Sequence, residues 1–221
     1  MKFVLIGAGS EIAAEFMKLC KENNIDFFTV SRNKINEDLS NNNLIISNYV
    51  DSKKSISRFI NNIENPTVIF FNGALFENRP LLHPSKNEIE ITKVVNYDIP
   101  YTLTKYLKEK NDINKFIYLS SIAAVVPRPK NYIYGSFKRK LEDDVAKLNL
   151  DNYLFVRFGK VFTQMSINHR TPPFSLEPHQ AGKIILKKVN NRGVVYGNFG
   201  LFVMGSILKL IPRKIISRIN L

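Results

Sequence analysis

Cysteine and histidine are scarce in this sequence. Cys20 is the only cysteine, so no internal disulfide can form, and its place in the helical-looking stretch EFMKLCKEN indicates a packed core thiol rather than a nucleophile. The three histidines, His83, His169 and His179, are scattered and have no partner at metal-ligand spacing. The sequence therefore predicts neither a disulfide framework nor a metal site.

Long hydrophobic runs are absent as well. No apolar stretch approaches the length of about 20 residues that a membrane-spanning helix requires. The opening MKFVLIGAGSEIAAEF has a short apolar run that Glu11 interrupts, which a strand explains better than a signal peptide does. We therefore expect a cytoplasmic protein. With 44% hydrophobic and 23% charged residues, the 221 residues suit one well-buried domain spanning 1–221.

Acidic residues are missing from the last part of the chain, where none follows Glu177. A formal net charge of +13 raises the question of a nucleic-acid partner. The bases are spread along the chain, however, and the tail of residues 200–221 is apolar as well as basic. That composition suits a membrane surface or an anionic ligand better than a duplex groove. We expect no nucleic-acid partner, and either peripheral membrane contact through the tail or packing of the tail on the core or on a second subunit. The bases of the tail are Lys209, Arg213, Lys214 and Arg218.

Strand and helix signals alternate along the chain. Ser10 is an expected N-cap of the first helix, Asp51 could cap the second, and Pro212 is expected to break a helix in the tail. Near-continuous apolar strands that alternate with helices predict an α/β fold, with one doubly wound parallel sheet and helices on both faces. Ligands of such sheets bind at the carboxyl ends of the strands. The expected strands are 2–7, 25–31, 43–49, 66–74, 114–121, 152–159 and 193–197, and the expected helices are 10–23, 52–64, 87–110, 131–150 and 177–191.

The stretch GAGSEIA follows the first strand and opens the first helix. Backbone N–H groups and the helix N-terminus favour an anion at this position, and two glycines allow a tight turn with close approach. The stretch therefore predicts a Rossmann-like dinucleotide site at its first six residues. The residues concerned are Gly7, Gly9, Ser10, Glu11 and Ile12.

The second strand bears on the choice of dinucleotide. An NAD site usually has an acid there, which accepts from the ribose 2′-hydroxyl. This strand ends TVSRN, without a carboxylate, and Ser31 with Arg32 would suit a 2′-phosphate instead. The sequence favours NADP over NAD.

Tyr134 and Lys138 are four residues apart, which puts both side chains on one face of a helix. Three other Tyr/Lys pairs share that spacing, at residues 49/53, 101/105 and 106/110, so the pair alone is not specific. Only this pair follows a serine at the end of an apolar strand, Ser121, which comes thirteen residues before Tyr134. Upstream, Asn72 ends the fourth strand and Asn96 lies inside the long helix. The other three pairs are interpreted as solvated surface residues.

With these residues the chain resembles the short-chain dehydrogenase/reductase (SDR) family over nearly its whole length. The stretch RFGKVFT is similar to the family's Arg-Pro-Gly-x-Val-x-Thr segment. The resemblance implies an NAD(P)-dependent oxidoreductase in which Tyr134 donates or accepts the proton and Lys138 assists it and binds the nicotinamide ribose. It also implies that Ser121 hydrogen-bonds the substrate oxygen and that Asn96 supports a water relay to the lysine. A free tyrosine has a pKa of about 10, which the ammonium and the nicotinamide ring are expected to lower.

The resemblance implies further cofactor contacts. Asn48 or Tyr49 stands where the family holds adenine, and Asn72 with Gly73 stands in a turn that reads Asn-Gly-Ala instead of Asn-Ala-Gly. The residues that hold the carboxamide and phosphates correspond to Val161 and Thr163. The chain departs from the family at Glu11, Ala13 and Phe158, which replace two glycines and a proline. Glu11 would repel a pyrophosphate unless it points away or caps the helix.

The substrate is less defined. The stretch GSEIA and the chain ending resemble the reductases of lipid-linked arabinose synthesis, the decaprenylphosphoryl-keto-pentose 2-reductase-like subgroup, which implies a keto-sugar substrate that could be lipid-linked. A soluble nucleotide-sugar or an acyl thioester is the alternative substrate. A non-catalytic dinucleotide-binding regulator is a further alternative, but it would not need Ser121, Tyr134 and Lys138. We also expect a homo-oligomer.

Overall fold

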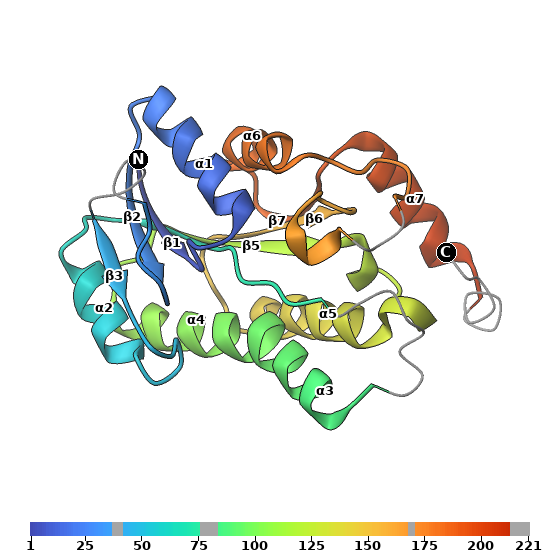
Figure 1. The fold of residues 1–221 in the computed structure, drawn as a ribbon, viewed down its shortest axis with the longest axis horizontal. Helices are drawn as coiled ribbons and strands as arrows, with labels where there is room; N and C mark the ends of the chain where they lie inside the picture. The colour runs from blue at the N-terminus through green and yellow to red at the C-terminus, as the bar shows by residue number, and fades with distance from the viewer. Residues whose placement is uncertain (37–41, 76–83, 168–170, 213–221) are drawn as a thin grey trace.

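The computed structural model describes residues 1–36, 42–75, 84–167 and 171–212. Seven parallel strands in these ranges form one sheet in the order β3-β2-β1-β4-β5-β6-β7 (Figure 1). This arrangement confirms the predicted doubly wound α/β fold; the third strand is shorter than expected. The strands are β1 (Lys2–Ile6), β2 (Asp26–Ser31), β3 (Asn43–Ile45), β4 (Thr67–Phe70), β5 (Lys115–Ser121), β6 (Tyr153–Phe158) and β7 (Gly193–Tyr196).

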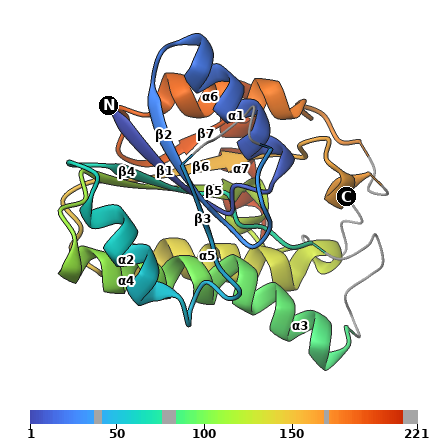
Figure 2. The same cartoon turned by 60° about the vertical axis from the view of Figure 1, so that its left-hand side comes forward.

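Helices cover both faces of the sheet (Figures 1 and 2). Phe3 and Leu5 of β1 pack against the layer of α1 and α6, whereas Val4 and Ile6 pack against the layer of α2, α4 and α5. Alternate side chains of a strand point to opposite faces, so a continuous apolar strand fills two cores at once. The helices are α1 (Glu11–Glu22), α2 (Lys53–Asn61), α3 (Lys86–Lys93), α4 (Ile99–Lys110), α5 (Tyr132–Ala146), α6 (Pro178–Lys188) and α7 (Phe199–Leu210).

Of the two predicted N-cap residues, one is confirmed and the other is wrong. The hydroxyl of Ser10 accepts from the backbone N–H of Ala13 at 3.1 Å, which confirms the predicted cap of α1. The prediction that Asp51 caps α2 is wrong, because Ser52 is the N-cap and no side chain accepts from the first turn.

The long helix predicted at 87–110 is interrupted by a π-helical turn, Val94–Asp98, between α3 and α4. Pro100 has no N–H to donate to the carbonyl of Asn96 four residues earlier, and its ring crowds that carbonyl. The N–H of Ile99 bonds to the carbonyl of Val94, five residues back. The irregular turn therefore surrounds Asn96, one of the predicted site residues.

A buried ion pair joins α5 to the sheet. Glu142 of α5 accepts from Arg157 of β6 with both carboxylate oxygens, with Nε to Oε1 at 3.0 Å. The Ser120 hydroxyl donates to Oε1 at 2.5 Å, and Nη1 of Arg157 donates to the Tyr196 hydroxyl at 2.9 Å. The network connects α5 to the ends of β5, β6 and β7, and thereby fixes the helix that carries Tyr134.

Only part of the predicted C-terminal tail lies within the residues that the structure describes. Helix α7 ends at Leu210, two residues before Pro212, as expected. Arg213, Lys214 and Arg218 lie outside the described residues, as do His83 and His169. Within the described ranges, no helix has the length and apolar character needed to cross a bilayer, and no three potential metal ligands come together.

Candidate active site

Ser121 and Tyr134 meet at the carboxyl edge of the sheet. Ser121 is the last residue of β5, and its hydroxyl accepts from the N–H of Ala123 at 3.2 Å. Tyr134 stands in the first turn of α5, and its hydroxyl is close enough to the Ser121 side chain for that side chain to lower the pKa of Tyr134. The contact requires a glycine beside the tyrosine, because a Cβ on Gly135 would lie 2.6 Å from the carbonyl oxygen of Ala123. The glycine lets α5 approach the segment after Ser121 closely.

Lys138 lies one helical turn after Tyr134 and is almost fully buried, with 4% of its surface exposed. Its Nζ donates to the carbonyl of Leu119 at 2.9 Å and to the carbonyl of Asn72 at 3.4 Å. The same atom lies 5.7 Å from the centroid of the Tyr134 ring. The structure thus brings together three of the predicted catalytic residues, from β5 and α5.

Burial acts on the two titratable groups in opposite senses. It lowers the pKa of Lys138 to about 8, against the attraction of the Glu142 carboxylate. It raises the pKa of Tyr134 to about 12, against the influence of the Ser121 side chain. The expectation that the ammonium lowers the pKa of the tyrosine is wrong for the protein alone, because desolvation of the phenolate outweighs it. Tyr134 therefore keeps its proton near neutral pH, as a proton donor must.

Asn96 is fully buried, and its side chain is occupied. Nδ2 donates to the carbonyls of Ala74 at 2.8 Å and Thr92 at 2.9 Å, while Oδ1 accepts from the N–H of Ala74 at 3.4 Å. These bonds occupy both N–H groups of the Asn96 amide. Pro100 has no N–H to donate to the backbone carbonyl of Asn96.

The Gly-rich turn has room for a ligand. Gly7 has a φ of +81°, where a glycine is favoured, and a Cβ on Gly9 would meet nothing within 4 Å. The Asn72 side chain packs against Gly7, and its Oδ1 is buried without a partner in the described part of the chain. Open space over Gly9 and an orphaned acceptor beside Gly7 fit a bound phosphate with neighbouring ribose hydroxyls.

Glu11 neither caps α1 nor occupies the turn. Its Oε1 accepts from the N–H of Gln164 at 2.8 Å, in the short 3-10 turn after β6. The hydroxyl of Ser166 in that turn donates to the carbonyl of Val161 at 2.6 Å and accepts from the N–H of Thr163 at 3.1 Å. The predicted cofactor residues Val161 and Thr163 therefore belong to a segment that the Glu11 carboxylate ties to the Gly-rich turn.

The end of β2 departs from the sequence expectation. Ser31 is buried, and its hydroxyl donates to the carbonyl of Asn33 at 2.5 Å, so it is not directed to a 2′-phosphate as expected.

Arg32 is exposed and close enough to Tyr49 to oppose the rise that burial causes in the pKa of Tyr49. Tyr49 is 6% exposed, so it is not the solvated residue predicted from its Tyr/Lys pair. Asn48 is exposed, and its Oδ1 accepts from the N–H of Val50 at 2.8 Å.

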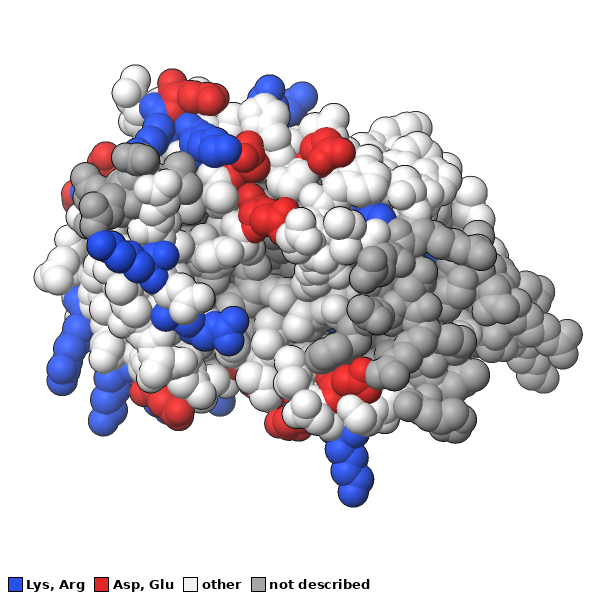
Figure 3. Space-filling view, viewed as in Figure 1, with Lys and Arg blue, Asp and Glu red and all other residues white. Residues whose placement is uncertain are grey.

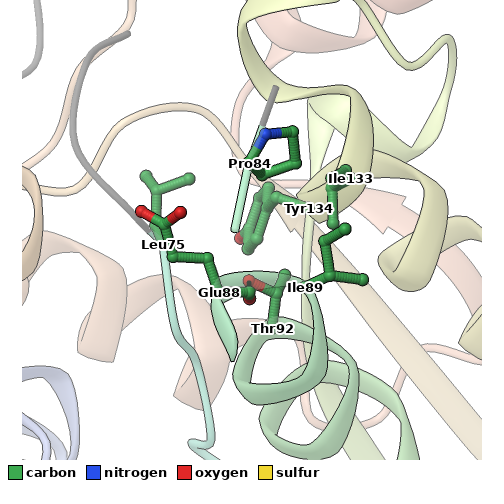
Figure 4. Close-up of a pocket in the computed structure, with 7 residues that line it drawn as sticks. All are labelled: Leu75, Pro84, Glu88, Ile89, Thr92, Ile133 and Tyr134. Atoms are coloured by element: carbon green, nitrogen blue, oxygen red, sulfur yellow. Dashed lines mark hydrogen bonds between the residues drawn. The ribbon is translucent and has the colours of Figure 1, made fainter. Parts of the chain in front are cut away.

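A pocket opens beside Tyr134 between the start of α3 and the start of α5 (Figure 4). Figure 4 shows the tyrosine ring among mostly apolar side chains, with Glu88 and Thr92 as the polar members. This wall of the pocket could not be predicted from the sequence, because apolar residues of a pocket look like core residues. The lining residues are Leu75, Pro84, Glu88, Ile89, Thr92, Ile133 and Tyr134.

No family model and no curated protein matches this chain by sequence. Solved structures match it by fold. A short-chain dehydrogenase from Burkholderia cenocepacia in complex with NADP superposes with a TM-score of 0.77 at 16% identity, covering 100% of this chain and 97% of that one. The carbonyl reductase Sniffer of Drosophila melanogaster has a TM-score of 0.75 at 16% identity, with 89% and 96% covered. A serine dehydrogenase from Escherichia coli has a TM-score of 0.71 at 14% identity, with 89% and 96% covered. The fold is therefore the one found in these dehydrogenases and reductases.

Titration of Lys138 tests the geometry of the site in the protein alone. We expect its ammonium to lose the proton with a midpoint near pH 8, well below the value of about 10.4 for a free lysine, because burial disfavours the charge. The ¹⁵Nζ resonance of labelled protein, assigned by its loss in Lys138→Met, measures this midpoint. A midpoint near the free value would show that the lysine is solvated and that the described packing of α5 on β5 is wrong.

Proposed function

We propose that this chain is an NADPH-dependent oxidoreductase of the SDR type, which reduces a ketone to an alcohol. The observation that carries the proposal is the contact of Ser121 and Tyr134 beside a buried Lys138, at the same sheet edge as an open Gly-rich turn. The NADP complex of the Burkholderia dehydrogenase, which has this fold, supports the choice of cofactor. A non-catalytic regulator would not need a tyrosine beside a serine next to a buried ammonium.

Each side chain has a distinct task in this proposal. Bound NADPH supplies the hydride. The Ser121 hydroxyl orients the carbonyl oxygen, and Tyr134, which is protonated at neutral pH, gives its proton to that oxygen. Lys138 stabilises the resulting phenolate by its charge, and a water on the Asn96 carbonyl returns a proton through the lysine.

The proposed cofactor residues follow the same edge. Backbone groups of Gly7, Gly9, Ser10 and Ile12 hold the pyrophosphate, and Oδ1 of Asn72 accepts from a ribose hydroxyl. Arg32 binds the 2′-phosphate, and Asn48 contacts adenine. Lys138 with Gly73, Val161 and Thr163 frames the nicotinamide half. Ser31 is left out of the 2′-phosphate site because its hydroxyl donates to the carbonyl of Asn33. Tyr49 is left out of the adenine site because its side chain is buried.

A keto-sugar carried on a lipid is the favoured substrate, because of the surface of α7. The buried side of α7 packs Leu201 and Leu208 against Ile122 and Val125, directly after Ser121. The other side is apolar yet exposed, and Figure 3 shows few charged side chains over this part of the molecule. An apolar helix face without acidic residues, with bases following it in sequence, suits an anionic membrane surface. The exposed residues are Phe199, Phe202, Val203, Ile207 and Leu210, at 38–84% exposure.

Loss of the Tyr134 hydroxyl tests the reaction itself. Tyr134→Phe removes the transferable proton and should lower kcat for a keto-sugar by roughly 10²-fold or more, the scale of lost acid catalysis. NADPH binding should persist, since the ring remains. Tyr101→Phe is the matched control, because Tyr101 stacks on Tyr97 of the same helical region, away from Ser121. Full activity of the Tyr134 variant would contradict the proposed mechanism.

Removal of Arg32 tests the cofactor. Arg32→Ala should raise the Kd for NADPH and leave that for NADH almost unchanged, because only NADPH carries the 2′-phosphate. A charge-assisted contact of this kind is worth about 1.5–3 kcal/mol. Fluorescence titration with both cofactors measures the difference. Equal weakening of the two would assign Arg32 a structural role.

Vesicle sedimentation tests the surface of α7. Wild-type protein should sediment with phosphatidylglycerol vesicles, less so as salt screens its bases. The triple change Phe199→Ser, Ile207→Ser and Leu210→Ser should abolish sedimentation and leave reduction of a small soluble ketone intact, since these side chains are exposed. If wild-type protein never sediments at low salt, a soluble keto-sugar replaces the lipid-linked one.

A further inference from the structure

A half-buried arginine, Arg128, lies in the loop between Ser121 and Tyr134. Its Nε is shielded from solvent without a hydrogen-bond partner in the residues that the structure describes. Burial lowers the pKa of this guanidinium, and no carboxylate opposes the shift. Buried charges are normally paired, since desolvation is otherwise uncompensated. Arg128 therefore has unused capacity to bind an anion.

Another half-buried arginine shows how the chain treats a structural guanidinium. Arg157 binds both carboxylate oxygens of Glu142 and the hydroxyl of Tyr196. Its pKa is raised by these partners, although burial alone would lower it. Arg128 has a similar degree of shelter, and among the residues that the structure describes it has no ion pair of this kind to explain its position.

The backbone around Arg128 is stiff. Pro127 and Pro129 flank it, and it has φ −112° and ψ 159°, the extended conformation that a following proline imposes. Its N–H donates to Oδ1 of Asn131 at 3.4 Å, and Nη1 of Arg139 in α5 donates to the carbonyl of Val125 at 3.2 Å. The loop is thus attached to α5 on both sides of Arg128, which reduces the entropy that ordering on binding would cost.

The loop also places Arg128 near the reacting end of the site. The 3-10 turn Pro129–Asn131 runs directly into α5, so only five residues lie between Arg128 and Tyr134. Rises of about 2 Å per 3-10 residue and about 1.5 Å per α residue give about 10 Å along the axis. A substrate group about 10 Å from a carbonyl held at Tyr134 would therefore lie near Arg128.

We propose that Arg128 binds an oxyanion of the ketone substrate, a phosphate ester or a carboxylate, and selects for substrates that carry one. This inference rests on the proposed reductase function. A guanidinium matches such oxyanions through two parallel N–H donors. A neutral ketone offers the guanidinium no such partner, so the loop favours substrates that carry an oxyanion.

Matched pairs of ketones test the selection. We expect Arg128→Gln to lower kcat/KM for ribulose 5-phosphate or for acetoacetate by about 10- to 100-fold, the scale of a lost charge-assisted hydrogen bond. Values for the neutral counterparts, ribulose and acetone, should not change, nor should the Kd for NADPH. The pair that responds identifies the oxyanion as phosphate or carboxylate. Arg58→Gln is the control, because Arg58 is exposed on α2 and carries the same charge.

Two further results separate this inference from the proposed function. Arg128→Gln could lower kcat/KM equally for charged and neutral ketones, or could leave both values unchanged. Either result overturns the role of Arg128 and leaves the reductase function standing. If no ketone is reduced, the function fails, and calorimetric binding of ribulose 5-phosphate and acetoacetate decides the inference alone. Binding that Arg128→Gln abolishes supports it, and absence of binding to wild-type protein overturns it. A thermal unfolding midpoint that Arg128→Gln lowers markedly would indicate a structural arginine instead.

Discussion

The ammonium of Lys138, buried among main-chain carbonyls, is the constraint on which the site depends. Its Nζ donates to the carbonyl of Leu119 in β5 and to the carbonyl of Asn72 just after β4, so one side chain of α5 contacts the ends of two strands. An ammonium in this position must keep such partners, since an unpaired buried charge is strongly destabilising. These bonds fix how α5 is rotated and how far it lies from the sheet. They therefore also place Tyr134 beside Ser121. Gly135 permits the approach and Glu142 reinforces it from one turn further along.

The same burial sets the protonation states that the proposed chemistry uses. With pKa values moved to about 8 and about 12, Lys138 is mostly charged and Tyr134 is protonated at neutral pH. A protonated phenol beside a cation is in the state that can donate a proton, as the proposed reduction requires. Above about pH 8 the lysine loses its charge, so its support for a phenolate is lost as pH rises.

Local patterns were enough to predict the sheet, the Gly-rich turn and the grouping of Ser121 with Tyr134 and Lys138. Apolar periodicity and fixed spacing along one chain segment carry that information. Features set by distant partners were missed. The hydroxyl of Ser31 turns inward because Asn33 and Asn43 accept from it, and the Asn96 amide is bound to Ala74, 22 residues away. The π-helical turn needs both Pro100 and the packing around Asn96. The isolation of Arg128 can be recognised only when its surroundings are known.

Transfer of a labelled hydride tests the central claim most directly. NADPH that carries deuterium on the transferring face of C4 should yield, with wild-type protein and a keto-sugar, an alcohol with one deuterium at the former carbonyl carbon. Mass spectrometry of the product measures this, and Tyr134→Phe should form the same labelled product far more slowly. Oxidation of NADPH without label in any alcohol, or no oxidation with any anionic or neutral ketone, would contradict the assignment of this chain as a carbonyl reductase.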